Sequence, residues 1–160
     1  MLDAISNNQF LMQNIQEFTV LIQISLVILT ITSIIVSGLF ILSQQKLAKN
    51  LAKINNSEKI HPAWLWTQLI PIWSSIAFVV TAVKLDEQVK KYNIDYNQKL
   101  KFKASLVYWY VGFLILGLIP IVNIIAGIIN FFIFIIIWSN ISSSSKQIQN
   151  TLKSNYSKQF

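Results

Sequence analysis

Cysteine and arginine are both absent from this 160-residue chain. Without cysteine, the chain forms no disulfide and no thiolate metal site. Without arginine, it lacks the group that makes bidentate carboxylate clamps, arginine fingers and voltage-sensing ladders. All 13 basic residues are therefore lysine. Together with the abundant isoleucine and asparagine, this bias is typical of AT-rich codons, so we expect a bacterial source.

Charge is also absent from three long stretches, residues 18–45, 62–83 and 104–145. An uncharged apolar run of about 18 residues or more is typical of a membrane span. The sequence therefore predicts an all-α integral membrane protein surrounded by the lipid bilayer. The net charge of +7 comes from lysines between and after these stretches. That placement is typical of cytoplasmic loops beside anionic lipid headgroups, and it argues against nucleic acid as a partner.

We expect a single membrane domain, residues 1–160, that is polytopic with four transmembrane helices. As one helix, residues 104–141 would be about 57 Å long, nearly twice the hydrocarbon thickness of about 30 Å. This segment must therefore fold back, and Pro120 marks the turn of a tight hairpin. The expected spans are residues 18–42, 62–83, 101–118 and 121–141, followed by a polar cytoplasmic tail, residues 142–160.

The lysines also predict the orientation. Four crossings put both termini on one side, and the lysines of residues 84–103 and of the tail place that side in the cytoplasm. The expected location is thus the bacterial inner (cytoplasmic) membrane, with several passes. No lysine precedes the first span, so a cleavable signal peptide is not expected.

Pro71 lies inside the second span and is expected to kink or break it. A break permits an alternative topology, in which residues 62–83 form a re-entrant hairpin. Every lysine-bearing segment would then lie inside, including residues 46–59, whose four lysines fit poorly on the outer face. Lipid cannot satisfy the turn of such a hairpin, which would need burial within an oligomer. Four ordinary spans are therefore favoured.

Small and polar residues recur along the first span with alternating steps of four and three. We call these residues the seam: Thr19, Gln23, Leu26, Thr30, Ser33, Ser37, Phe40 and Gln44. This spacing is typical of one helix face. The seam is interpreted as a surface that packs against another helix, since membrane helices associate through small residues and modest hydrogen bonds. A water-lined path built from several copies is the alternative.

The fourth span carries a similar face, with Asn123, Gly127 and Asn130. Asn123 is expected to cap the start of this helix, and Asn130 to find a hydrogen-bond partner within the bundle. The helix-packing or pore-lining residues predicted from the sequence are Gln23, Thr30, Ser33, Ser37, Asn123, Gly127 and Asn130, with Pro71 and Pro120 as structural kinks or turns. The expected interfacial aromatics are Trp64, Trp66, Trp109 and Trp138.

Groups that carry chemistry are missing from these spans. No Asp, Glu or Lys lies within the uncharged stretches, residues 18–45, 62–83 and 104–145, whereas proton relays and ion-coupled transporters usually need such a residue. The chain has no nucleophile paired with a base, no metal-ligand cluster and no Gly-rich phosphate loop. His61, the only histidine, is interpreted as interfacial surface. We therefore expect no enzyme activity, no catalytic residue, no cofactor and no metal.

Several short matches lie in the last two thirds of the chain. They are Pro62-Ala63-Trp64-Leu65-Trp66, Leu69-Ile70-Pro71-Ile72, Ile119-Pro120-Ile121, Ala126-Gly127-Ile128 and Ile137-Trp138. Over about residues 61–141, the chain resembles a broad family of uncharacterised small bacterial integral membrane proteins with four predicted helices. The resemblance implies a four-helix membrane fold and supplies no catalytic residue. Leu-Ile-Pro-Ile also occurs twice, at residues 69–72 and 118–121, a match too short to establish a duplication.

These observations predict a non-enzymatic integral membrane subunit. It would assemble through its polar and small helix faces, either with itself as a homo-oligomer or with a larger membrane complex as an accessory subunit. The alternative function is a homo-oligomeric pore or channel lined by the seam of the first helix.

Overall fold

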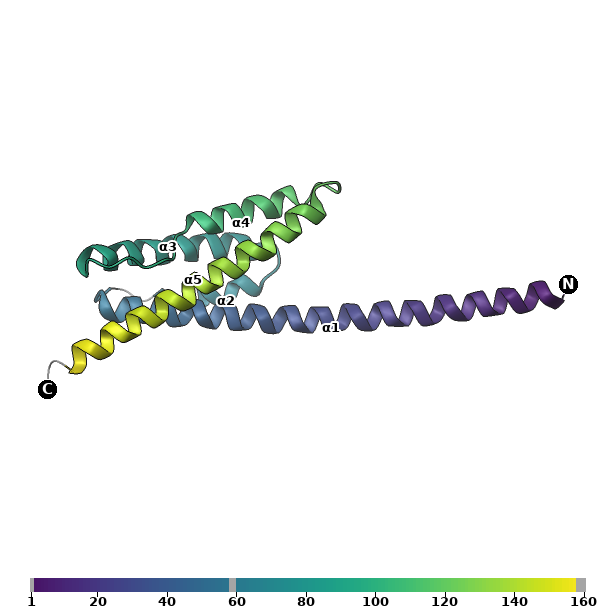
Figure 1. Cartoon of the computed structure of the whole chain (residues 1–160), viewed down its shortest axis with the longest axis horizontal. Helices are drawn as coiled ribbons and strands as arrows, with labels where there is room; N and C mark the ends of the chain where they lie inside the picture. The colour runs from purple at the N-terminus through teal and green to yellow at the C-terminus, as the bar shows by residue number, and fades with distance from the viewer. Residues whose placement is uncertain (1, 58–59, 158–160) are drawn as a thin grey trace. The chain divides into compact units, whose positions relative to one another are not determined.

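The computed structural model describes residues 2–57 and 60–157, and over these residues the chain is all-helical with no strand. Figure 1 shows the elements in order along the chain. They are α1 (Leu2–Ile54), α2 (Pro62–Trp66), the 3-10 helix η1 (Thr67–Leu69), α3 (Trp73–Asp95), α4 (Ser105–Leu116) and α5 (Asn123–Ser157). The expected fold class is thus confirmed as all-α.

Among the described residues, two helices are long and apolar enough to cross a membrane. They are the part of α1 from Ile15 to Ile54 and the part of α5 from Asn123 to Ser154. The other apolar segments are shorter, since α4 has only 12 residues and residues 62–83 are divided among α2, η1 and the start of α3.

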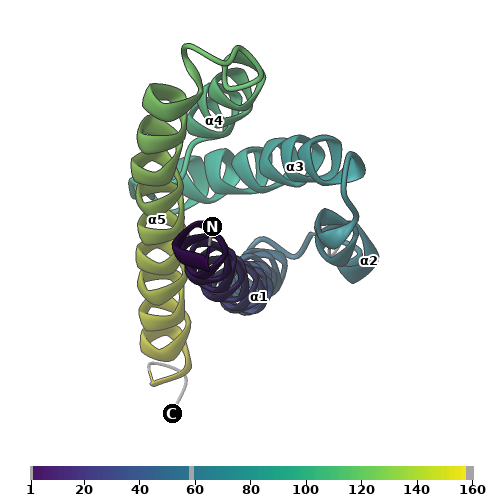
Figure 2. The ribbon, with the colours of Figure 1, turned by 90° about the vertical axis from the view of Figure 1, so that its right-hand side faces the viewer.

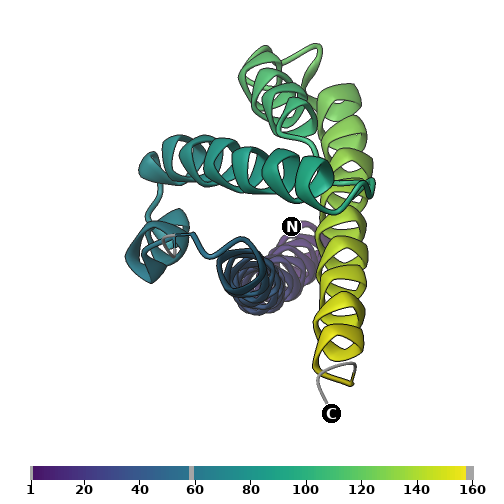
Figure 3. The same cartoon turned by 90° about the vertical axis from the view of Figure 1, so that its left-hand side faces the viewer.

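The chain divides into two compact units, Met1–Leu39 and Phe40–Phe160. The first unit is the greater part of α1, and its apolar side chains from Ile15 to Ile35 are largely exposed. The second unit contains the end of α1 and all later helices. Within it, α2 and α5 lie on opposite sides, with α3 between them (Figures 2 and 3).

Local sequence explains where these helices begin and end. Pro62 opens α2, where a missing N–H costs nothing, and the Ala63 N–H donates to His61 Nδ1 at 3.2 Å. Pro71 separates η1 from α3, so residues 62–83 contain a complete break. Ile72, directly after it, has a φ of 69°, a value uncommon for a β-branched residue.

Asparagines with positive φ terminate α1 and α3. Asn56 has a φ of 46° and Asn97 a φ of 48°, in the left-handed region that asparagine tolerates better than most residues. The next N–H in each case reaches back into the helix. Ser57 N donates to the Ala52 carbonyl at 3.1 Å, and Gln98 N to the Asn93 carbonyl at 3.2 Å. Each helix therefore ends in a closed cap.

The last helix extends well beyond the expected span. Residues 142–160 were expected to be a polar tail, but α5 continues to Ser157. The reason is that one face of the helix stays apolar. Ile141 and Ile148 are fully buried in the core of the second unit, and Leu152 packs against it. Hydropathy located the end of the apolar run, which is not the end of the helix.

An aromatic cluster lies in the core of the second unit. The Phe40 ring contacts the rings of Phe78, Phe134 and Trp138 at centroid distances of 5.5, 4.8 and 5.9 Å. Tyr110 contacts Phe78 at 5.7 Å and Phe134 at 6.4 Å. Four helices meet here, since these residues come from α1, α3, α4 and α5.

Candidate functional site

The seam is the strongest candidate for a functional surface, and its first part lies in the first unit. Gln23, Thr30 and Ser33 are exposed, and Ser37 is partly buried. The hydroxyl groups of Thr30 and Ser33 donate to the carbonyls of Leu26 and Leu29, each at 2.8 Å. Because these donors are satisfied by their own helix, they need no partner, and the seam offers small side chains for close helix packing.

The last two seam residues belong to the second unit, where both are buried. Phe40 is 5% exposed and Gln44 is fully buried. Phe40 anchors the aromatic cluster described above. Gln44 pairs with Gln68 of η1 through two amide hydrogen bonds. Gln68 Nε2 donates to Gln44 Oε1 at 2.8 Å, and Gln44 Nε2 donates to Gln68 Oε1 at 3.2 Å.

Thr81 completes this buried amide pair, since Gln68 Nε2 also lies 3.4 Å from its Oγ1. Thr81 lies on α3 and is fully buried. The three side chains join α1, η1 and α3 where Pro71 has broken the helix. A reciprocal amide pair satisfies its own polar groups, so it holds η1 in place without needing a ligand.

We expect Gln44→Leu to destabilise the second unit by about 1–3 kcal/mol, because it leaves the partly buried Gln68 amide without its main partner. The double variant Gln44→Leu/Gln68→Leu should recover most of this loss, since two apolar side chains need no hydrogen bond. A double-mutant cycle measured by unfolding in detergent micelles tests this. Additive losses would show that the two amides do not act as a pair.

Asn130 joins α4 and α5. Its side chain is 8% exposed. The amide is oriented by its surroundings, so that its nitrogen donates to the Tyr110 carbonyl at 3.0 Å and its oxygen accepts from the Leu114 N–H at 3.1 Å. Both polar ends of Asn130 are therefore satisfied by the backbone of α4, and the side chain has a structural role.

The other polar residues of this face differ from expectation. Asn123 is the first residue of α5, whereas an N-cap lies one position earlier. Its N–H donates to the Ile119 carbonyl at 3.0 Å. A Cβ added at Gly127 would meet nothing within 4 Å, so no neighbour within the described chain requires glycine there. Gly117 is closer packed, with the Phe113 and Leu114 carbonyl oxygens 3.3 Å from an added Cβ.

The expected interfacial tryptophans fall into two groups. Trp66 and Trp109 are exposed, at 41% and 65%. Trp64 is partly buried, stacks on Trp73 at 6.3 Å and has Lys84 Nζ at 5.7 Å from its ring. Trp138 is partly buried, and its Nε1 donates to Ser43 Oγ at 3.0 Å. Trp138 therefore belongs to the aromatic core as well as to any interface.

A second polar cluster, which the sequence did not indicate, joins α3 to the end of α5. Tyr92 is fully buried. Its hydroxyl donates to Gln98 Oε1 at 2.9 Å and lies 3.0 Å from Thr151 Oγ1. Gln147 Nε2 donates to the same Gln98 oxygen at 3.1 Å. The members are distant in sequence, and only the apolar spacing of Leu85, Val89 and Tyr92 on α3 hinted at a buried face.

Charged residues gather at the start of α4. Asp86 Oδ2 pairs with Lys90 Nζ at 2.8 Å, and Asp86 Oδ1 accepts from the Ala104 N–H at 3.2 Å. The hydrogen bond to Asp86 and the charge of that carboxylate raise the pKa of Lys90. The adjacent cavity, of about 510 Å³, is lined by Glu87 and Lys103 as well as these two residues. Two acids and two bases balance, so the cavity selects no ion of one sign.

Among the residues that the structure describes, no group of three or more His, Cys, Asp or Glu side chains is placed to hold a metal ion. No family model, curated protein or solved structure matches the chain. The expected resemblance to small four-helix bacterial membrane proteins therefore stays a prediction from the short matches quoted above.

Proposed function

We propose that this chain is a non-enzymatic subunit of the bacterial inner membrane, which assembles through the seam of α1 with copies of itself or with a larger membrane complex. The observation that carries this proposal is the change in burial along the seam. Phe40 and Gln44 are buried among other helices of the chain, whereas Gln23, Thr30 and Ser33 are exposed. The exposed residues continue the spacing of a surface already used for packing.

The membrane location is supported by the exposed apolar residues of α1. Leu21, Val27, Ile28 and Ile34 are each more than half exposed, and they lie on several sides of the helix. A helix that is apolar all round is typical of a membrane span. Lipid satisfies these side chains but gives no hydrophobic gain for helix association, which then depends on close contact between small residues. The seam provides such residues.

We expect the double variant Thr30→Leu/Ser33→Leu to weaken assembly about tenfold, because two positions at about 0.6–1 kcal/mol each approach the 1.4 kcal/mol that corresponds to a factor of ten. The larger side chains hold the helices apart. Native mass and subunit counting in lipid nanodiscs measure the assembly.

The matched control is Ser25→Leu/Thr32→Leu. It makes the same two chemical changes within about one helical turn of residues 30 and 33, but on a different face of α1, because residues 25 and 32 lie roughly 120° around the helix from the centre of the seam. Equal effects of the two double variants would contradict a packing role for the seam. Unchanged assembly together with loss of ion conductance in the Thr30/Ser33 variant would instead support a pore.

A further inference from the structure

The two Leu-Ile-Pro-Ile segments form two similar turns. Residues 69–72 connect η1 to α3, and residues 118–121 connect α4 to α5. In both turns, the carbonyl of the isoleucine before proline accepts a hydrogen bond from the N–H four residues later. Ser74 N donates to the Ile70 carbonyl at 2.8 Å, and Asn123 N donates to the Ile119 carbonyl at 3.0 Å. The repeated sequence thus marks the tips of two helical hairpins.

Both tips expose large apolar side chains. Ile72 is 94% exposed, Ile121 is 90% exposed and Leu118 is 81% exposed. Turns that lie in water are normally built from Gly, Asn, Asp and Ser, whose side chains are small or polar. Neither tip has a charged residue within nine positions. Such tips are suited to a hydrocarbon environment and unsuited to the aqueous face that a crossing hairpin would reach.

One helix behind each tip is too short to cross a bilayer, whereas α5, the other helix behind the second tip, is long enough. The 12 residues of α4 span about 18 Å. On α3, the uncharged part from Trp73 to Val83 spans about 16 Å before Lys84 is reached. The hydrocarbon core is about 30 Å thick. The shorter arms of the two hairpins therefore have nearly the same apolar length, which is little more than half of the thickness of the hydrocarbon core.

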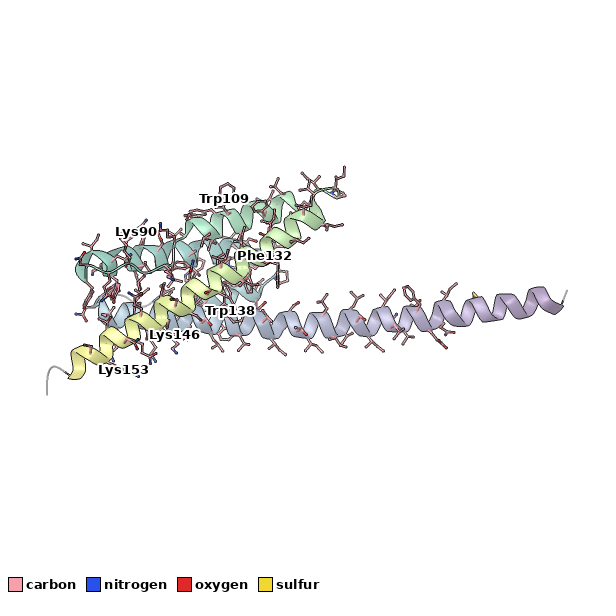
Figure 4. The ribbon with its side chains drawn as sticks, in the orientation of Figure 1. Lys90, Trp109, Phe132, Trp138, Lys146 and Lys153 are labelled. Atoms are coloured by element: carbon pink, nitrogen blue, oxygen red, sulfur yellow. The ribbon has the colours of Figure 1, made fainter. Side chains whose placement is uncertain are left out.

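Within the second unit, both tips lie toward the same end. In Figure 1, the turn before α3 and the turn between α4 and α5 lie at the same end of the unit. The C-terminal ends of α3 and α5 lie at its other end. The labelled lysines, Lys90, Lys146 and Lys153, lie toward that opposite end, while Trp109 and Phe132 lie nearer the tips (Figure 4). The unit thus has one apolar end and one cationic end.

Most N–H groups of the second turn are hydrogen-bonded within the turn or to α4. The N–H groups of Leu118 and Ile119 donate to carbonyls of α4, and those of Val122 and Asn123 both donate to the Ile119 carbonyl. Pro120 has no N–H to satisfy. The main objection to a turn in lipid is the cost of unpaired backbone groups. The paired N–H groups lower this cost at the second turn.

We propose that residues 62–83 and 104–141 form two re-entrant hairpins, which enter the bilayer from the cytoplasmic face and turn within it. Their Leu-Ile-Pro-Ile tips contact the acyl chains of the lipid. This inference rests on the proposed membrane location, and it replaces the crossings of both segments by a single crossing at α1. All lysine-bearing segments then lie on the cytoplasmic side, including the four lysines of residues 46–59, which four crossings would leave outside.

The absence of cysteine makes the test direct, since any single introduced cysteine is the only thiol in the chain. Ile72→Cys and Ile121→Cys report on the tips, and their high exposure means that neither change removes core packing. Lys99→Cys reports on the lysine-bearing side and Met12→Cys on the N-terminal segment. Each variant is treated with a membrane-impermeant maleimide in intact spheroplasts and in inverted membrane vesicles.

We expect Lys99→Cys to be labelled only in inverted vesicles and Met12→Cys only in spheroplasts. The two tip variants should react at less than about a tenth of these rates from either side, because the hydrocarbon core excludes the charged reagent. Labelling of Ile121→Cys or Ile72→Cys in spheroplasts would show that the hairpin crosses, and would overturn the proposal.

Nitroxide labels at the same two positions separate lipid from protein surroundings. We expect collisions with oxygen to exceed collisions with a water-soluble nickel complex at both tips, as in hydrocarbon. Protection from both reagents would place the tips inside a protein interface and overturn the lipid contact. Release of the wild-type protein from membranes by alkaline carbonate would contradict the membrane location itself, which is a different failure from labelled tips in a membrane-bound protein.

Discussion

Replacing Phe40 with alanine is expected to destabilise the second unit by about 3–5 kcal/mol, as for other large-to-small changes at buried aromatic positions. The side chain is 5% exposed, and its ring contacts Phe78, Phe134 and Trp138. Edge-on and tilted aromatic pairs add about 0.5–1.5 kcal/mol each beyond the area that they bury. Loss of this ring therefore removes one connection from the end of α1 to both α3 and α5.

Unfolding in mixed micelles with increasing denaturing detergent measures this loss, followed by helical circular dichroism. Phe132→Ala is the matched control, because Phe132 lies on α5 but is 59% exposed. It should change the free energy of unfolding by no more than about 0.5 kcal/mol. A loss for Phe132→Ala as large as that for Phe40→Ala would mean that the aromatic cluster is not the core of this unit.

Tyr92→Ala is expected to lower the stability of the second unit by a similar amount, about 3–5 kcal/mol. Tyr92 lies in the polar cluster that joins α3 to the end of α5. Tyr92 is fully buried, and its ring stacks on Tyr96 at a centroid distance of 4.9 Å. Its hydroxyl connects Gln98, in the segment after α3, with Thr151 near the end of α5. This side chain therefore holds the final turns of α5 against α3.

Tyr92→Phe separates the hydroxyl from the ring. We expect a smaller loss of about 1–3 kcal/mol, because the ring still packs but Gln98 and Thr151 lose a buried partner. The same unfolding measurement applies, and hydrogen exchange of residues 147–155 should increase in both variants. A Tyr92→Phe variant as stable as wild type would contradict the hydrogen bonds through the Tyr92 hydroxyl.

The sequence predicted much of the fold because its strongest signals are local. Uncharged apolar runs predicted an all-helical chain, and Pro71 and Pro120 predicted interruptions at positions where the structure has turns. The same signals could not locate the end of α5. Hydropathy ends near Ile141, whereas the buried face of the helix continues through Ile148 at wider spacing. An apolar run and a helix have different limits when only one side of the helix is covered.

The polar contacts were harder to predict, because their members are far apart in the chain. Gln44 was placed on the seam by its spacing, but nothing in the sequence pairs it with Gln68 rather than with a second chain. Tyr92 and Thr151 come from α3 and α5. Which residues of these two helices face each other depends on how the helices pack, and the sequence alone does not show it. Asn130 was expected to find a partner, yet that partner is the backbone of α4, which no side-chain pattern identifies.

The contact of Asn130 has a consequence for how the second hairpin moves. Tyr110 and Leu114 are four residues apart, so the Tyr110 carbonyl and the Leu114 N–H form one backbone hydrogen-bonded pair of α4. The Asn130 amide binds both of these groups. In the proposed location within the bilayer, separating α5 from α4 would withdraw the amide from both backbone groups with no water to replace it. We therefore expect the two helices to move as one body near Asn130, with thermal opening starting at the ends of the hairpin.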